Sequence, residues 1–220
     1  MGREIALDTP SGRVCAWRAD PMAQPVGGLV VVQEIFGVNG HVRSLVERYC
    51  AEGWVALAPE LFDPIERGVE LAYDEAGVRK GRALAAALGF DQAVGIVGAA
   101  VARLRGEGLA VAAVGFCWGG TVALLANTRL GVPAVSYYGG RSVPFLDEPL
   151  RAPMAFHFGE RDPIIPPADV DRHRAAYPEA PMHAYPAGHG FNCEQRGDYD
   201  AESARLAHRR TLDFLAEAVA

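Results

Sequence analysis

The chain has 220 residues, of which 50% are hydrophobic and 22% charged, and its formal net charge is -6. This composition is typical of a globular protein, and we expect one domain over residues 1–220. The acidic balance and the scattered Lys and Arg residues argue against nucleic-acid binding. The start, MGREIALDTP, places charges where a signal peptide needs an apolar core, and no apolar run suggests a membrane span. We therefore expect a cytoplasmic protein that binds neither nucleic acid nor membranes.

The predicted elements begin with a hairpin and then alternate between strands and helices. The hairpin is predicted from residues 3–7 and 13–17. Apolar runs predict further strands over residues 27–34, 54–61, 109–116, 132–140, 152–160 and 181–186. Helices are predicted over residues 39–53 and 91–105, directly after the turn at 115–120, and over 167–178 and 200–219. Residues 63–82 are richer in Gly and charged residues, which indicates a surface loop leading into a helix, the stretch GVRKGRALAAALGF at residues 77–90.

The alternation predicts an α/β fold with a mostly parallel central sheet and helices on both faces. In such a sheet, ligands gather at the carboxyl ends of the strands. Four predicted strand ends carry reactive side chains, namely Glu34, Cys117, Asp162 and His189. These four residues are therefore the candidates for chemistry.

Cys117 lies in the stretch VAAVGFCWGGTVALLAN, which predicts a strand, a glycine-rich turn and a helix. This pattern matches the nucleophile elbow G-x-S-x-G with sulfur in place of oxygen. The glycines allow a tight corner, and the N-terminus of the following helix favours a thiolate and a developing oxyanion. The alternative is a buried, inert cysteine beside a glycine turn, since free Cys is often buried.

The chain order Cys117, Asp162, His189 is that of the α/β-hydrolase triad. A thiol needs a base within reach, which His189 would supply, while Asp162 would hold the imidazole in the useful tautomer. Each residue also has a simpler interpretation: Asp162 as a turn residue before Pro163, His189 as a loop histidine, and Glu34 as a solvated charge. Their joint order, each at a strand end, favours catalysis.

The four cysteines are widely spaced, with no C-x-x-C pair and no histidine cluster beside them. This spacing argues against both a disulfide framework and a metal site. We expect neither a metal nor a cofactor.

The stretches VVVQEIFGVNGHVR, GFCWGG, SYYGG, GERDPIIP and AGHGF resemble, in this order, the dienelactone hydrolase family, also called carboxymethylenebutenolidases. The resemblance runs along nearly the whole chain and implies an α/β-hydrolase fold, with the nucleophile, acid and base named above as catalytic triad. It further implies an oxyanion hole formed by the backbone N–H groups of Ile35 and Trp118, and Tyr138 as a pocket wall. By the same resemblance, Glu34 contacts the resting cysteine and takes its proton when substrate arrives.

The sequence departs from the family at the two arginines that hold a substrate carboxylate. The first position corresponds to Lys80, flanked by Arg79 and Arg82, and the second to Cys193, with Arg196 three positions later. A lysine is a point charge rather than a bidentate fork. We therefore expect Lys80 to contact substrate and anionic substrates to be favoured only modestly.

The leading hypothesis is a cysteine-dependent hydrolase that opens a carboxymethylenebutenolide-type lactone or cleaves a related small-molecule ester. The alternative enzymatic function is a carboxylesterase or thioesterase of broader specificity. A catalytically silent binding module is the non-enzymatic alternative, and the intact triad argues against it. We expect a monomer or a small homo-oligomer.

Overall fold

The computed structural model describes residues 2–220 and contains one eight-stranded sheet in the order β1-β2-β4-β3-β5-β6-β7-β8. Strand β1 pairs antiparallel with β2, and β2 with β4, while all pairings among β3 to β8 are parallel. The predicted N-terminal hairpin and the mostly parallel sheet are thus confirmed. The strands are β1 Arg3–Thr9, β2 Gly12–Ala19, β3 Gly27–Val32, β4 Trp54–Pro59, β5 Val111–Phe116, β6 Ala134–Tyr137, β7 Met154–Gly159 and β8 Met182–Tyr185.

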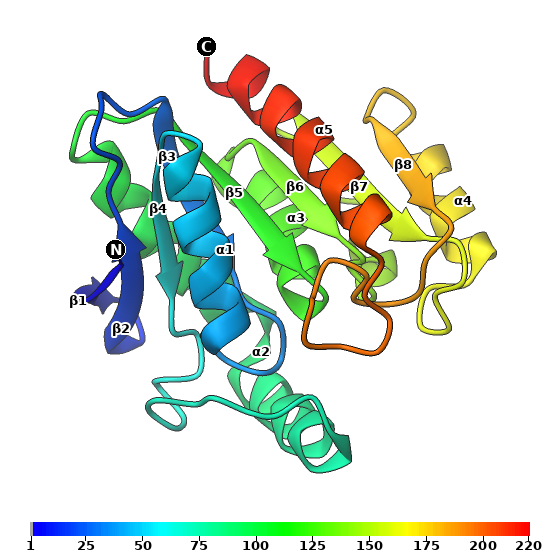
Figure 1. Cartoon of the computed structure of the whole chain (residues 1–220), viewed down its shortest axis with the longest axis horizontal. Coiled ribbons are helices and arrows are strands. Elements are labelled where there is room, and N and C mark those ends of the chain that lie inside the picture. Colours follow the sequence, from blue (N-terminus) through cyan, green and yellow to red (C-terminus); the bar gives the residue numbers. More distant parts are fainter. Residues whose placement is uncertain (1) are drawn as a thin grey trace.

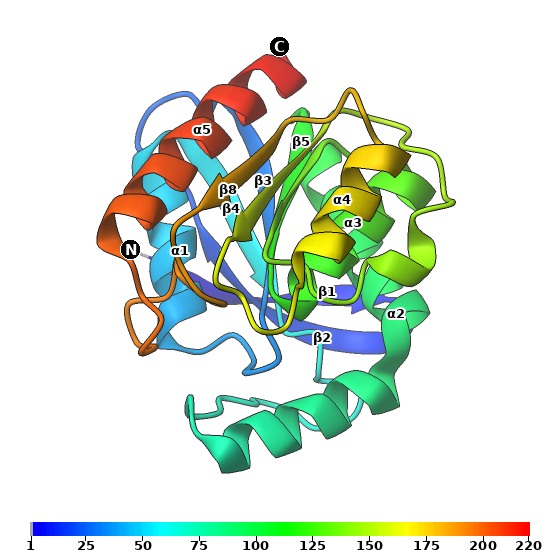
Figure 2. The ribbon, with the colours of Figure 1, turned by 90° about the vertical axis from the view of Figure 1, so that its right-hand side faces the viewer.

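Helices cover both faces of this sheet. They are α1 Gly40–Ala51, α2 Glu75–Arg105, α3 Trp118–Leu130, α4 Pro167–Ala176 and α5 Ala201–Val219, with a short 3-10 helix over Val143–Phe145. Figures 1 and 2 show α1 and α5 on one face, and α2, α3 and α4 on the other. Right-handed crossovers between parallel strands place helices on the two faces in this way.

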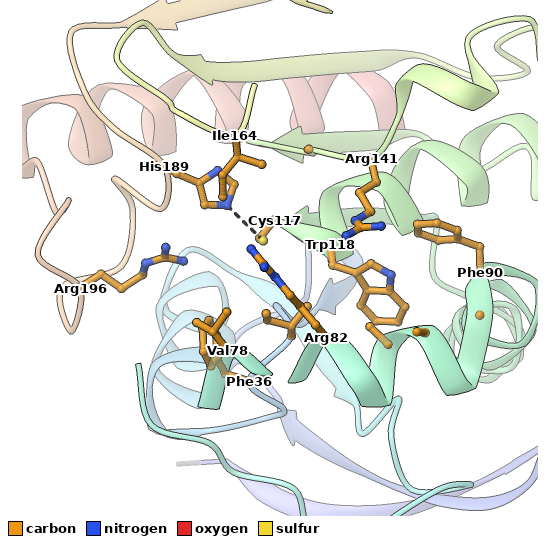
Figure 3. A pocket seen from close by; sticks show the side chains of 15 residues that line it. Phe36, Val78, Arg82, Phe90, Cys117, Trp118, Arg141, Ile164, His189 and Arg196 are labelled. Carbon is orange, nitrogen blue, oxygen red and sulfur yellow. Dashed lines mark hydrogen bonds between the residues drawn. The ribbon is translucent and has the colours of Figure 1, made fainter. Parts of the chain in front are cut away.

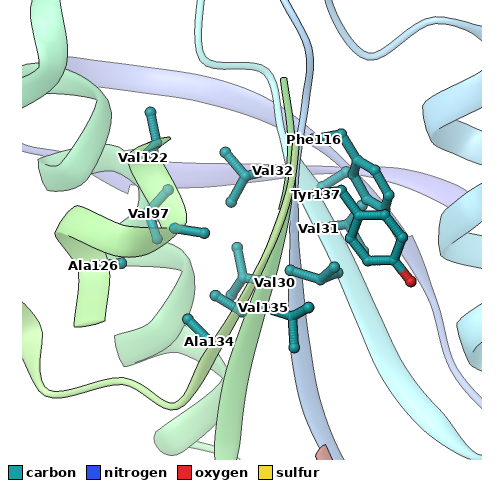
Figure 4. Packing of buried hydrophobic residues seen from close by; sticks show 14 of the residues in the cluster. Val30, Val31, Val32, Val97, Phe116, Val122, Ala126, Ala134, Val135 and Tyr137 are labelled. Carbon is teal, nitrogen blue, oxygen red and sulfur yellow. The ribbon is translucent and has the colours of Figure 1, made fainter. Parts of the chain in front are cut away.

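The central strands are buried on both sides because their side chains alternate between two apolar layers. Every residue of β3, β4 and β5 is buried. In Figure 4, Val30 and Val32 lie toward Val122 of α3, whereas Val31 lies on the opposite face beside Tyr137. A strand with apolar residues at consecutive positions suits such a two-sided environment. The buried central strands therefore hold the loops at the carboxyl edge of the sheet in fixed positions.

Helix α2 begins inside the segment 63–82, which was predicted as a loop leading into a helix, and it contains a sharp bend. The Asp74 side chain accepts a hydrogen bond from the Gly77 N–H, so residues 75–82 are helical rather than part of the preceding loop. At Gly89 the backbone leaves the helical region (φ 72°, ψ 167°), and Figure 2 shows the two halves of α2 meeting at an angle. The first half consequently projects beyond the sheet's carboxyl edge.

Among the described residues, α2 is the one helix long and apolar enough to cross a membrane by length and composition. Its apolar stretch was not recognised as such in the sequence. Half of that stretch is buried inside the protein, and the bend at Gly89 interrupts it. Core helices of globular proteins also meet the same criterion, and both features fit that interpretation.

Candidate active site

The turn between β5 and α3 holds Cys117 in a backbone conformation that few L-residues adopt. Its φ of 54° and ψ of -120° lie outside the common regions, and its N–H donates to the Tyr137 carbonyl over 3.0 Å. A side chain at Gly115 would collide with the Gly119 carbonyl, and one at Gly119 with the Gln33 carbonyl. The predicted elbow is therefore formed, and it exposes the sulfur at the N-terminus of α3.

His189 and Asp162 lie beside this elbow, on the loops that follow β8 and β7. The His189 Nε2 atom is 3.1 Å from the Cys117 Sγ atom, and Nδ1 is 2.7 Å from Asp162 Oδ2. Asp162 Oδ1 accepts hydrogen bonds from the N–H groups of Ile164 and Ile165. The Asp162 carboxylate is thus fixed by the backbone, and it in turn fixes the imidazole. Figure 3 shows the His189 ring directed at the Cys117 sulfur, with the hydrogen bond between them as a dashed line.

The environment of His189 favours its charged form. Burial alone lowers the pKa of the imidazole, but the hydrogen bonds and charges of Asp162 and Cys117 outweigh it and raise this pKa to about 10. A protonated imidazole at neutral pH stabilises a thiolate at hydrogen-bond distance. The Cys117 sulfur therefore lies beside a charged imidazole at hydrogen-bond distance.

The other three thiols lack such a partner. Burial raises the pKa of Cys193 and, with nearby carboxylates, that of Cys15 to about 11. Burial likewise raises the pKa of Cys50. These thiols are consequently neutral and weakly nucleophilic at neutral pH. Cys117 differs from them in having a histidine nitrogen at hydrogen-bond distance.

Two backbone N–H groups at the cavity, those of Ile35 and Trp118, have no hydrogen-bond acceptor within residues 2–220. Trp118 is the first residue of α3, so its N–H has no intrahelical acceptor, and the Ile35 N–H donates no hydrogen bond within residues 2–220. Ile35 and Trp118 both line the cavity above Cys117. Gly81 of α2 packs so closely on Ile35 that a side chain there would collide with the Ile35 carbonyl. Helix α2 therefore holds the Ile35 loop in place.

Glu34 is brought to the site but contacts a different partner from the one expected. Its carboxylate is 1% exposed, and Oε1 lies 3.3 Å from Arg196 Nη1. The Arg196 guanidinium also lies 5.9 Å from the ring centres of Phe36 and Tyr73. The expected contact with the resting thiol is not formed within residues 2–220: Cys117 is hydrogen-bonded to His189, and Glu34 to Arg196.

Tyr138 packs against His189 rather than forming a wall of the cavity. The residue is fully buried, its φ is 40°, and its ring meets the His189 ring edge-on with centroids 5.1 Å apart. It is not among the residues that line the cavity. The expectation of a pocket wall is corrected to a packing contact behind the imidazole.

A cavity of about 350 Å³ opens above the sulfur, and three arginines line it. Figure 3 shows the side chains of Arg82 and Arg196 reaching toward Cys117, with Arg141 near Trp118. Lys80 does not line the cavity; its Nζ atom pairs with Glu66 over 2.6 Å. The expectation for Lys80 was wrong because Arg82, two residues later, lies on the helix face toward the cavity.

Sequence reasoning missed Arg141 and Phe90. Arg141 follows the strand end SYYGG, so the rule that ligands meet strand ends applied to it as well. Phe90 had no comparable signal, because the bend at Gly89 that turns it toward the cavity is not visible in the helical pattern. Among residues 2–220, no group of three or more His, Cys, Asp or Glu residues is arranged to hold a metal.

Comparison with known proteins agrees with this geometry. The family model for the dienelactone hydrolase family matches residues 14–219. A carboxymethylenebutenolidase of Pseudomonas putida is 33% identical over 207 residues, which cover 89% of this chain and 88% of the relative. A Klebsiella pneumoniae protein of known structure that bears the dienelactone hydrolase name is 27% identical, with a TM-score of 0.85 and 98% of each chain covered.

The fold extends to more distant hydrolases. A dienelactone hydrolase-like promiscuous phosphotriesterase from metagenomic libraries is 19% identical and has a TM-score of 0.79, with 100% of this chain and 99% of that one covered. At this identity the likeness concerns the fold alone. The match over residues 14–219 and the curated relative decide the family: the chain has the α/β-hydrolase fold and belongs to the dienelactone hydrolase family of lactone and ester hydrolases.

Proposed function

We propose that this protein is a cysteine-dependent hydrolase of small carboxylic esters and lactones, with Cys117 as nucleophile, His189 as acid and base, and Asp162 as the group that orients the imidazole. The observation that carries the proposal is the continuous hydrogen-bonded chain from Asp162 through His189 to Cys117, which ends at the floor of a cavity. Each link has the distance of a hydrogen bond, and the acid and base are both buried.

The reaction follows from these positions. The Cys117 thiolate attacks the carbonyl carbon, a C–S bond forms, and the oxyanion accepts hydrogen bonds from the N–H groups of Ile35 and Trp118. When the oxyanion collapses, the ester C–O bond breaks and the His189 imidazolium gives its proton to the leaving oxygen. Water then attacks the thioester while His189 takes its proton, and the carboxylic acid leaves as the thiolate is restored.

Glu34 acts in this proposal through Arg196. In the resting enzyme the Glu34 carboxylate is paired with the Arg196 guanidinium. An anionic substrate that binds Arg196 competes for the same guanidinium and frees the carboxylate next to the reacting groups. Glu34→Gln should accordingly change the rate and pH profile of Cys117 alkylation, and an unchanged profile would show Glu34 to be a bystander.

The arginines near the sulfur support substrates that carry a carboxylate. Arg82 makes no ion pair within residues 2–220, and Arg196 shares its charge with Glu34 alone. Arg82 is exposed, so water screens its interaction with an anion. The preference for anionic over neutral substrates should therefore remain modest, on the order of tenfold.

A panel of lactones, oxygen esters and thioesters tests the proposal, with wild type compared with Cys117→Ala. Hydrolysis of the lactones and oxygen esters should be lost in Cys117→Ala and retained in the matched control Cys50→Ala, whose thiol is half-buried on α1. Iodoacetamide should inactivate the wild type and the control equally. Undiminished hydrolysis by Cys117→Ala would overturn the proposal, and turnover confined to thioesters would restrict it to that class.

A further inference from the structure

The cavity extends away from the nucleophile along two stacked aromatic rings, Phe90 and Trp118, which we call the aromatic shelf. Their ring centroids are 5.9 Å apart with an interplanar angle of 27°. Phe62 stacks on Trp118 at 5.7 Å, and Phe145 meets Phe90 edge-on at 5.2 Å. The shelf is therefore held in place by further aromatic contacts. Because it is held in the free protein, a ligand does not have to order it on binding.

The wall beside the shelf consists of small residues of α2. Ala85, Ala86 and Gly89 line the cavity, and a Cβ atom added at Gly89 would meet no atom within 4 Å. Larger side chains at these positions would fill the space beside Phe90 and Trp118. The sequence of α2 thus leaves room there for a flat group. Stacking on fixed rings favours an aromatic group over a saturated one of equal size.

One cation lies at this end of the cavity. Figure 3 shows the Arg141 guanidinium near the Trp118 ring, with Phe90 on its far side from Cys117. Arg141 lines the cavity and makes no ion pair within the part of the chain that the structure describes. Its backbone N–H donates to Thr121 Oγ1 over 3.2 Å, which fixes the start of the side chain. An anion beside the shelf would find an available guanidinium.

We propose that the aromatic shelf and Arg141 form a subsite for a planar aromatic group that carries an anionic substituent, so that the enzyme favours aryl esters or aryl-substituted lactones of this kind. The ring lies along Phe90 and Trp118, and its substituent faces Arg141. This subsite is distinct from the two arginines beside the sulfur, Arg82 and Arg196. The inference names the substrate class and rests on the proposed ester hydrolysis.

The first test compares two acetates that differ in charge but hardly in size, 4-carboxyphenyl acetate and 4-carbamoylphenyl acetate. The ratio of their kcat/KM values should fall about five- to tenfold in Arg141→Gln, the size expected for a guanidinium at the mouth of a cavity. Taking the ratio cancels the different intrinsic reactivities of the two esters. The control is Arg79→Gln, which removes the same charge from an exposed position of α2 that does not line the cavity.

Arg82→Gln serves as the competing variant. If it removes the preference for the carboxylate and Arg141→Gln leaves it unchanged, the anion binds beside the nucleophile and the inference is overturned. Equal losses in Arg141→Gln and Arg79→Gln would also overturn it, because they would reflect net charge alone.

The second test fills the space beside the shelf. Ala86→Phe should lower the ratio of kcat/KM for phenyl acetate to that for 2,2,2-trifluoroethyl acetate about tenfold, since only the aryl ester needs that space. An unchanged ratio would show that the ring does not bind there.

A binding measurement separates failure of this inference from failure of the proposed function. By calorimetric titration, the wild type should bind benzoate more tightly than cyclohexanecarboxylate, and Arg141→Gln should weaken benzoate binding. This result needs no turnover, so it supports the subsite even if no ester is hydrolysed. Equal affinity for the two acids, together with ester hydrolysis by the wild type, would overturn the subsite while the proposed function stands.

Discussion

The two sides of the cavity are built in different ways. The proposed reacting wall consists of Cys117 and His189, with the buried Asp162 behind the imidazole. All three residues sit on loops at strand ends and are held by buried hydrogen bonds, and Cys117 has an unusual backbone conformation. The binding wall is the first half of α2, which presents Arg82 and Ala86 from one helix face, with exposed side chains. In the reacting wall, the backbone and buried hydrogen bonds fix where the side chains lie. In the binding wall, exposed side chains extend into the cavity, and their length and charge determine what they can contact.

This difference predicts how each wall responds to mutation. Changes in the reacting wall should lower kcat, because they remove interactions made in the transition state. Changes in the binding wall should act on KM and on the choice of substrate. A reacting-wall variant that changes only KM, or a binding-wall variant that changes mainly kcat, would contradict this difference.

The largest loss is expected for His189→Ala, which removes both the proton donor and the partner of the thiolate. We expect kcat/KM for an activated ester to fall about 10⁴-fold, the size found when acid–base groups are deleted from triads. His183→Ala, at a half-buried histidine of β8, is the matched control and should stay near wild type. Activity of His189→Ala within tenfold of wild type would remove His189 from the reacting wall.

Asp162→Asn should have the next largest effect, about 10²-fold or more on kcat, through orientation of the imidazole. It should also change the pH profile. In the wild type, burial lowers the pKa of His189 but the partners raise it to about 10, so the charged imidazole is lost only as the pH rises through that value. Loss of the Asp162 charge lowers this pKa, and the alkaline limb of kcat/KM should move to lower pH. A limb that stays in place would leave Asp162 as a turn residue.

Gly81→Ala tests the contact where the two walls meet. Alanine usually stabilises a helix relative to glycine, but here its Cβ would collide with the Ile35 carbonyl and displace an oxyanion donor. We expect kcat to fall about tenfold with little change in KM. Gly95→Ala on the same helix is the control, because its Cβ would make only an ordinary contact with Pro10. Equal kcat values for the two variants would contradict the account of the Ile35 loop.

The smallest effect is expected in the binding wall. Arg82→Gln should raise KM for an ester that carries its carboxylate on the acyl side about five- to tenfold and leave kcat nearly unchanged, because an exposed guanidinium binds ground state and transition state alike. Lys80→Gln removes a charge two residues away that pairs with Glu66, and it should change neither constant. A larger effect for Lys80→Gln than for Arg82→Gln would reverse the assignment of the anion contact.

The sequence placed Cys117, Asp162 and His189 at strand ends, and the structure brings them into contact, because strand ends, chain order and turn glycines all constrain the backbone. The binding wall was harder to predict. Lys80 and Arg82 are neighbours in the sequence, yet positions two apart on a helix point about 200° from each other, so the register of α2 decides which one meets substrate. That register depends on the start at Asp74 and the bend at Gly89, which the residue pattern did not reveal.

Arg196 illustrates the same limit for a loop. Cys193 occupies the position that corresponds to the family's second arginine, and the sequence alone did not decide whether Arg196 reaches the same space. In the structure Arg196 lines the cavity, while Cys193 is buried. Gly190, at φ 80°, leaves the space that the Arg196 side chain occupies, and a Cβ there would lie 2.6 Å from Arg196 Nε. Whether Arg196 or the residue at position 193 reaches the cavity depends on packing between residues that are distant in the sequence, so a local sequence pattern could not predict it.

The central claim is that Cys117 forms the covalent intermediate. It is tested most directly by mixing the enzyme with an activated aryl acetate, quenching with acid before the thioester hydrolyses, and locating the acetyl group by peptide mass spectrometry. We predict one acetyl group per chain, on the peptide that contains Cys117, and no acetylated peptide in Cys117→Ala. An acetyl group on another residue of the wild type, with turnover retained in Cys117→Ala, would contradict the account.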